Sequence, residues 1–159
     1  MGLQLPPGLA PMLDLMGAAF PATDEDQLTQ AAADWRSVAA KCAEWGTDLA
    51  GAVDYITSAN EGPGAAAFAA YMRGQSNMTG LAALGTAAER IAAGHEAAAA
   101  SVRDLKAAVI SVAAAAKANV ELAKRQPNPD TAALVAWLAQ AGAYVRSLDA
   151  ATATAIQEG

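Results

Sequence analysis

Apolar residues recur at steps of three and four along residues 23–59, which is the spacing of one face of an α-helix. The positions are Leu28, Ala31, Trp35, Val38, Cys42, Trp45, Leu49, Ala52 and Ile56. Charged side chains, among them Asp34, Lys41 and Asp48, fall on the opposite face. We therefore predict a first long helix over 23–59 with a continuous apolar seam, and Thr23 as its cap.

The sequence Asn60-Glu61-Gly62-Pro63-Gly64 interrupts this pattern and predicts a turn over 60–64. Gly62 supplies a permissive backbone, and Pro63 suits the first position of a new helix. Because so short a break joins two long helices, we expect an antiparallel hairpin. We also expect Gly62 to adopt a conformation disfavoured for residues with a Cβ, or to lie too close to a neighbour to admit one.

A second long helix is predicted over 64–125, because the same spacing resumes there. Its seam is Leu84, Ala88, Ile91, His95, Ala98, Val102, Leu105, Val109, Val112, Ala116 and Val120. Gly74, Ser76, Asn77 and Gly80 are poor helix residues, so a kink or short break is expected over 74–80.

A third helix is predicted over 129–158, since Pro127 and Pro129 end the second one and Asn128 can cap the next. Its apolar stripe is Leu134, Leu138, Ala141, Val145, Leu148, Thr152 and Ile156, and Trp137 and Tyr144 widen it. In contrast, residues 1–22 form an arm in which four prolines alternate with leucines and methionines. We expect this apolar arm to lie along the bundle with a short helix over 11–19; disorder is the competing interpretation.

The pattern as a whole predicts one all-α domain over 1–159. This is an elongated helical hairpin or bundle of long antiparallel helices with an additional C-terminal helix. Composition changes this picture in one respect, because 46 residues are alanine and only 5% are aromatic. Alanine favours helix but buries little area, so the core is expected to be thin. We therefore expect an apolar patch on the isolated chain, filled by another helical hairpin of the same or a different chain.

Charge excludes several kinds of partner. The formal net charge is −6, whereas nucleic acids and anionic membrane surfaces require a basic face. No apolar run is long enough to span a bilayer, so no membrane insertion is expected. The N-terminus also lacks the basic region of a cleavable leader, so any export is expected to be leaderless.

No group of residues indicates catalysis. His95 and Cys42 are the single histidine and cysteine, they are far apart in sequence, and both lie at seam positions. We expect both to pack in the core, and we expect no catalytic residues, no metal site, no cofactor and no enzyme activity. Trp35 and Trp45 are more informative, because tryptophan is common both in cores and at the centres of interfaces. The sequence leaves those two interpretations open.

The residues Asn60-Glu61-Gly62-Pro63-Gly64-Ala65-Ala66-Ala67-Phe68 resemble the Trp-x-Gly turn of the WXG/Esx proteins and their larger PPE relatives. The opening Leu5-Pro6-Pro7-Gly8-Leu9 is similar to the Pro-Pro start of PPE proteins, with Gly8 where they carry Glu. The resemblance covers about residues 5–158. Asn60 replaces the tryptophan of the turn, and no Tyr-x-x-x-Asp/Glu export signal is present. The absence suggests that a partner supplies the signal, or that this is a diverged domain no longer read by the secretion machinery.

This resemblance implies a type VII secretion substrate, or the N-terminal trafficking domain of a larger toxin-like effector. Such a protein is cytoplasmic before export, then secreted or at the cell surface. It would dock on a small WXG-type partner to form a four-helix bundle. The implied turn motif is Asn60, Glu61, Gly62, Pro63 and Phe68. The candidate partner-binding seam is Trp35, Val38, Trp45, Leu49, Ile56, Leu84, Ile91, Val102 and Leu105.

Two alternatives remain at this stage. One is a freestanding structural or adaptor bundle without an export role, either a monomer or a self-associated homodimer. The other is an enzyme or ligand-binding bundle, which the lack of a convergent polar cluster disfavours. The sequence leaves open the partner, any cargo, the place of the export signal, the oligomeric state and the organism.

Overall fold

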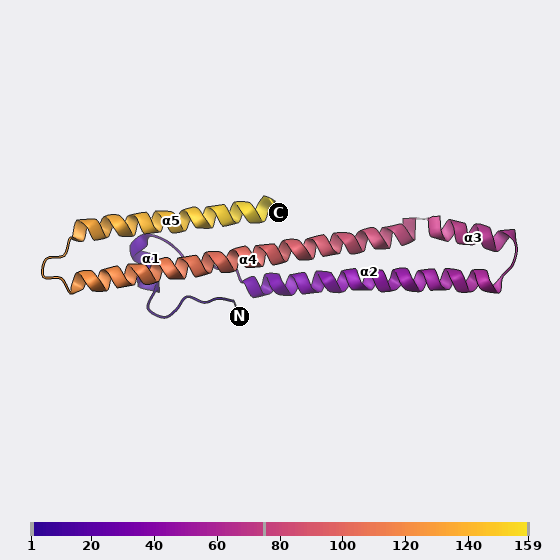
Figure 1. The fold of residues 1–159 in the computed structure, drawn as a ribbon, viewed down its shortest axis with the longest axis horizontal. Helices are drawn as coiled ribbons and strands as arrows, with labels where there is room; N and C mark the ends of the chain where they lie inside the picture. The colour runs from indigo at the N-terminus through magenta and orange to yellow at the C-terminus, as the bar shows by residue number, and fades with distance from the viewer. Residues whose placement is uncertain (1, 75, 159) are drawn as a thin grey trace. The chain divides into compact units, whose positions relative to one another are not determined.

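The computed structural model describes residues 2–74 and 76–158, which form five helices (Figure 1). These are α1 (Ala10–Met16), α2 (Glu25–Ala59), α3 (Pro63–Gly74), α4 (Ser76–Lys124) and α5 (Thr131–Glu158). Of the residues described, 84% are helical and none lies in a strand. Long helices pack side by side within each part of the chain, so the predicted all-α fold class is confirmed.

Aspartates, rather than the predicted Thr23 and Asn128, cap the two helices that begin after loops. The backbone N–H of Asp26 donates to Oδ1 of Asp24 at 3.0 Å, and the N–H of Ala133 donates to Oδ1 of Asp130 at 2.9 Å. An aspartate at this position satisfies a free N–H group and also places negative charge at the positive end of the helix dipole. The prediction for the caps was therefore wrong by one residue in α2 and by two in α5.

The predicted second long helix corresponds to α3 and α4. α3 ends at Gly74 and α4 begins at Ser76, whereas Gly80 lies within α4. Gln75 is outside the described residues, so the predicted kink over 74–80 stays a prediction at that position.

The chain divides into two compact units. Unit 1 comprises residues 1–28 and 97–159, and so contains α1, the second half of α4 and α5. Unit 2 comprises residues 29–96, and so contains most of α2, α3 and the first half of α4.

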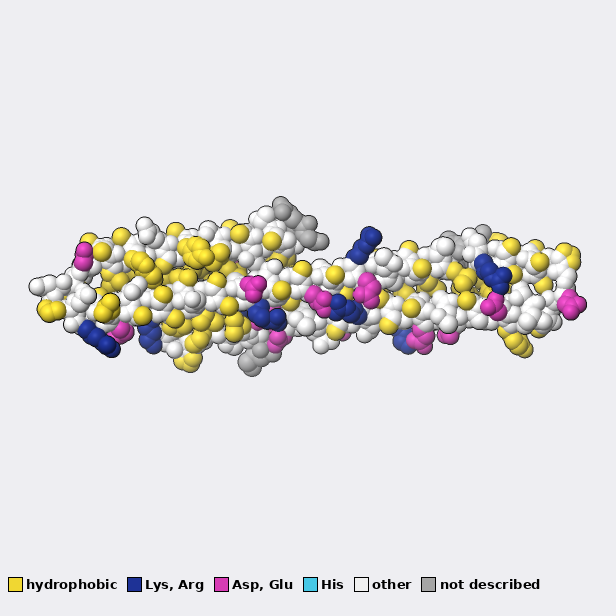
Figure 2. Space-filling view, in the orientation of Figure 1, with side chains coloured by type: hydrophobic (Ala, Val, Ile, Leu, Met, Phe, Trp, Pro, Cys, Tyr) yellow, Lys and Arg dark blue, Asp and Glu magenta, His cyan; other side chains and the backbone are white. Residues whose placement is uncertain are grey.

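Unit 1 has a core to which the N-terminal arm contributes directly. Its buried members are Leu9, Leu13, Met16, Leu105, Val109, Ala113, Ala116, Leu138 and Val145. Figure 2 shows hydrophobic side chains gathered densely where α1, α4 and α5 meet. Burial of large side chains of this kind contributes roughly 1.5–3 kcal/mol each. The expectation that the arm packs on the bundle is confirmed, and the alternative of disorder is wrong for residues 2–22.

The arm is also fixed to α5 through backbone contacts. Nη1 of Arg146 donates to the carbonyl oxygens of Met16 and Gly17, at 3.3 and 2.8 Å. Gly17 ends α1 in the left-handed conformation, with φ +60°. At Gly142 a Cβ would collide with the carbonyl oxygen of Met16, so glycine is required for α1 to approach α5 this closely.

Unit 2 is an antiparallel hairpin. Arg36 pairs with Glu96, Cys42 lies beside Gly85, and Asp54 pairs with Arg73, so partner numbers fall as α2 advances. Most of the seam residues between these helices are small: Ala32, Ala39, Cys42, Val53, Ala69, Ala88 and Ala92 are buried. Small side chains allow the two helix backbones to approach closely.

The seam of α2 in the structure agrees with the predicted seam at every second position. At the positions between, the packed residue is the one that follows the predicted residue. Ala32, Ala39 and Val53 are buried, whereas Val38, Trp45 and Ile56 are exposed. The expectation that Val38 and Trp45 face inward is therefore wrong for the chain alone. The predicted and observed seams share Trp35, Cys42 and Leu49, which are half-buried, buried and half-buried. The physical reason is that α2 has two adjacent apolar columns, and the column of smaller residues packs against α4.

Candidate interaction surface

The hairpin of unit 2 presents two different flanks beside its seam. In an antiparallel helix pair, the residues that directly precede the seam residues of both helices lie on one side of the seam, and the residues that directly follow them lie on the other side. Arg36 of α2 reaches Glu89 and Glu96 of α4, so these residues lie on one flank. Val38 and Trp45 lie on the other side of the α2 seam, one residue before Ala39 and Gly46. Leu84 and Ile91 likewise precede Gly85 and Ala92 in α4.

We call Val38, Trp45, Leu84 and Ile91 the apolar flank. Their exposed fractions are 38, 56, 51 and 40%, respectively. Tryptophan and branched aliphatic side chains left in water forgo about 25 cal/mol for each Å² of apolar area that could be buried. A large apolar flank beside a packed seam is the arrangement expected of a bundle with more than two helices, because a further helix can cover it.

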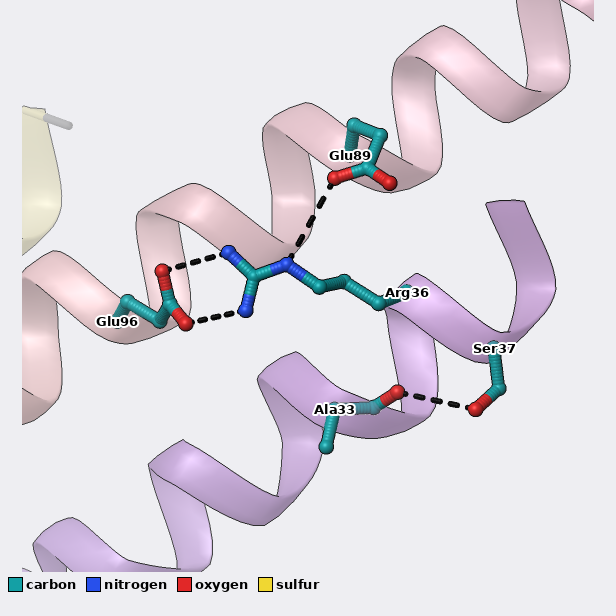
Figure 3. Close-up of polar contacts among 5 residues, drawn as sticks. All are labelled: Ala33, Arg36, Ser37, Glu89 and Glu96. Carbon is teal, nitrogen blue, oxygen red and sulfur yellow. Dashed lines mark hydrogen bonds and ion pairs between the residues drawn. The ribbon is translucent and has the colours of Figure 1, made fainter. Parts of the chain in front are cut away.

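The opposite flank is charged and holds α2 against α4 (Figure 3). Nη2 of Arg36 donates to Oε2 of Glu96 at 2.7 Å, Nη1 donates to the other carboxylate oxygen, and Nε lies 3.8 Å from Glu89. The hydrogen bonds and charge of Arg36 lower the pKa of Glu96, and those of Glu96 raise the pKa of Arg36. Since both side chains are nearly half exposed, the pair fixes alignment more than it adds stability.

An open groove of about 730 Å³ runs along unit 2 between α2 and α4. Its walls are mostly small residues, including Ala43, Ala50 and Ala82, with Glu89 as its one charged residue. Such a groove lacks the convergent polar groups that orient a small-molecule ligand.

The turn residues lie together at the tip of unit 2. Gly62 has φ +109°, which confirms the expected conformation, and a Cβ there would meet nothing within 4 Å. Nδ2 of Asn60 donates to the carbonyl oxygen of Ile56 at 2.7 Å and so caps the end of α2. Pro63 begins α3 and Glu61 is exposed. The side chain of Phe68 is 37% exposed.

The predicted partner-binding residues separate into three groups. The apolar flank and Ile56 are exposed, whereas Trp35 and Leu49 are half-buried along the seam of unit 2. Val102 and Leu105 are buried in unit 1, at 3 and 5% exposure. Only the exposed group is available to another chain without unfolding.

The residues considered for catalysis are not brought together. Cys42 is buried in the seam and His95 is half-buried in α4. Across residues 2–74 and 76–158, no three His, Cys, Asp or Glu side chains converge as a metal site would require. In the same residues, no helix is both long enough and apolar enough to cross a bilayer.

Sequence reasoning missed a buried ion pair in unit 1. Nζ of Lys106 lies 2.7 Å from Oε2 of Glu25, and the N–H of Leu3 donates to the same carboxylate. The ring of Phe20 lies 5.6 Å from the ammonium nitrogen. Burial alone would raise the pKa of Glu25, but these hydrogen bonds outweigh it and lower the pKa to about 2. The available signal was that Glu25 precedes the buried Ala32 by seven residues, the repeat of the seam.

The Arg36–Glu96 side, the apolar flank and the glycine turn all belong to one helical hairpin. The family model described as the WXG100 like domain matches residues 8–156, and the chain belongs to this family. It is therefore a helical protein related to type VII secretion. Comparisons with curated proteins and with solved structures give no match.

Proposed function

We propose that this chain is a non-enzymatic targeting module for type VII export that pairs with a small WXG-type helical hairpin. The observation that carries the proposal is the apolar flank of unit 2. Four large apolar side chains from two helices are 38–56% exposed beside a seam that is already packed. Membership of the WXG100-like family supports a helical hairpin as the partner.

The proposed role is binding, not chemistry. The partner hairpin lays its own apolar stripe over the apolar flank, and the two pairs of helices form a four-helix bundle. The partner also supplies the Tyr-x-x-x-Asp/Glu signal that this sequence lacks.

Export then delivers the folded pair to the cell surface or the medium, and this domain serves as the trafficking part of an effector. The proposal of a cargo rests on the family and on the all-helical architecture, in which we assign no catalytic residue. The secretion machinery would recognise the assembled pair, so export of this chain would depend on its partner.

Co-expression tests the proposal directly. The chain is produced with each small Trp-x-Gly protein encoded beside its gene, and complexes are isolated through a tag on this chain. We expect one such protein to co-purify in a 1:1 complex. Trp45→Asp and Leu84→Asp should each abolish the complex, because a buried unpaired carboxylate is strongly unfavourable in an apolar interface.

Matched controls separate loss of the interface from loss of the fold. Tyr144→Asp changes an exposed aromatic side chain of unit 1, at 54% exposure against 56% for Trp45, and should leave the complex intact. Helix content measured by circular dichroism should be the same in all variants. A complex that survives both flank variants would refute the proposed surface, and failure of every neighbouring protein to bind would refute the proposed pairing.

A further inference from the structure

One apolar stripe runs along α4 through the residues of both units. It consists of Leu84, Ala87, Ile91, Gly94, Ala98, Ser101, Leu105, Ala108 and Val112, at alternating steps of three and four. Every second member of the stripe is large, except at Ala98, and the members between them are small. This pattern suits a helix whose side chains insert between those of the stripe.

Within unit 1, α5 runs alongside the second half of α4 (Figure 1). Leu105 and Ala98 are 5 and 9% exposed, and Leu105 belongs to the same core as Leu138 and Val145 of α5. Ser101 and Ala108 of α4 line one groove with Leu148 and Thr152 of α5. In unit 1, α5 is therefore the helix that complements the stripe of α4, and its own apolar residues recur at steps of three and four.

Within unit 2, the residues of the stripe have no such cover. Leu84 and Ile91 are 51 and 40% exposed, and Ala87 is exposed between them. The two halves of the stripe therefore share one pattern and differ in burial.

We infer that the partner of unit 2 presents a helix of the same kind as α5, which lies against Leu84, Ala87 and Ile91. This inference rests on the proposed function and adds the chemistry of the partner. Its contacting face carries leucine or valine at heptad spacing, separated by alanine or another small residue.

The occupant is a different chain and not the α5 of a second copy. The α5 of each copy is fixed within its own unit 1 by the contact of Gly142 with Met16 and by the hydrogen bonds of Arg146 to α1. Leu138 and Val145 are buried there, so a second copy could offer them only by opening its own core.

A synthetic peptide of residues 131–158, capped at both ends and carrying fluorescein, serves as the probe. Fluorescence anisotropy measures its binding to the full chain, to the double variant Leu84→Asp with Ile91→Asp, and to Leu122→Asp. Leu122 is a control because it is an exposed leucine of α4 at 58% exposure, within unit 1. A second peptide carries Leu138→Asp and Val145→Asp.

We expect saturable binding to the chain and to Leu122→Asp, and at least about tenfold weaker binding to the double variant. The peptide with Leu138→Asp and Val145→Asp should lose binding to the same extent. No saturable binding, or equal binding to the double variant, would overturn the inference. A dimer of the chain alone that the double variant abolishes would also overturn it, in favour of a second copy. If a WXG-type partner requires the flank while the peptide does not bind, this inference fails and the proposed function stands.

Discussion

Nζ of Lys106 lies 2.7 Å from Oε2 of Glu25, and the two side chains are only 4 and 1% exposed. Eighty-one positions separate these residues in the sequence. Glu25 also accepts a hydrogen bond from the backbone N–H of Leu3. The ion pair therefore links the start of the N-terminal arm to α4 within unit 1.

Removal of one member of this pair should destabilise unit 1 strongly. Lys106→Met leaves a buried carboxylate without its cation, which typically costs about 3–5 kcal/mol. We expect a large fall in the melting temperature measured by circular dichroism. Glu121→Gln, which breaks an exposed pair with Lys124, is the control and should change the melting temperature little. A melting temperature of Lys106→Met equal to that of the control would contradict the buried pair.

The same pair predicts the response of the protein to acid. The pKa of Glu25 is lowered from 4.5 to about 2 in the folded chain, so its stabilising contribution is complete above about pH 4.5. That contribution is lost as the pH falls through about 2. The melting temperature should therefore decline below pH 4.5, and Glu25→Gln should show a smaller decline between pH 4.5 and 2. Parallel curves for the two proteins would show that Glu25 titrates normally.

Two glycines in long helices should respond oppositely to alanine. Gly142→Ala forces a methyl group against the carbonyl oxygen of Met16, and overpacking of this kind costs about 1–3 kcal/mol. Gly94→Ala meets no atom within 4 Å and should stabilise the helix by up to about 1 kcal/mol. Chemical unfolding measures both, and limited proteolysis should cleave the arm faster only in Gly142→Ala. Equal effects of the two variants would contradict the close approach of α1 to α5.

Two glycines at the tip of the hairpin should also respond differently to substitution by alanine. Gly62 has φ +109°, where a residue with a Cβ is strained, so Gly62→Ala should cost at least about 1 kcal/mol. Gly64 lies in α3, where an added methyl group would meet no atom within 4 Å, so Gly64→Ala should be neutral or stabilising. If both variants unfold at the same denaturant concentration as the parent, the turn conformation does not constrain residue 62.

The spacing of apolar residues predicted the long helices and the hairpin, because helix periodicity is a local property. It could not choose between the adjacent columns containing Val38 and Ala39. That choice depends on which side chains fit against α4, and the smaller Ala39 packs there. The sequence interpretation favoured the larger residues, which the structure leaves exposed.

The remaining misses also have non-local causes. The charge of Glu25 was explained by the helix dipole, which is correct for its place at the start of α2 but omits Lys106. Pairing of these two residues depends on the path of the arm. The burial of Leu105 likewise depends on α5, whose position against α4 is not encoded in the seam pattern alone.

The most direct test of the central claim is hydroxyl-radical footprinting of the free chain and of its complex with the co-purifying WXG-type protein. Trp45 and Trp137 lie in different units, so each reports on one of them by mass spectrometry. We predict that complex formation lowers the labelling rate of Trp45 at least about fivefold, as expected for an aromatic residue at the centre of an interface. The labelling rate of Trp137 should stay unchanged. A complex in which Trp45 is labelled as fast as in the free chain would contradict the proposed docking surface.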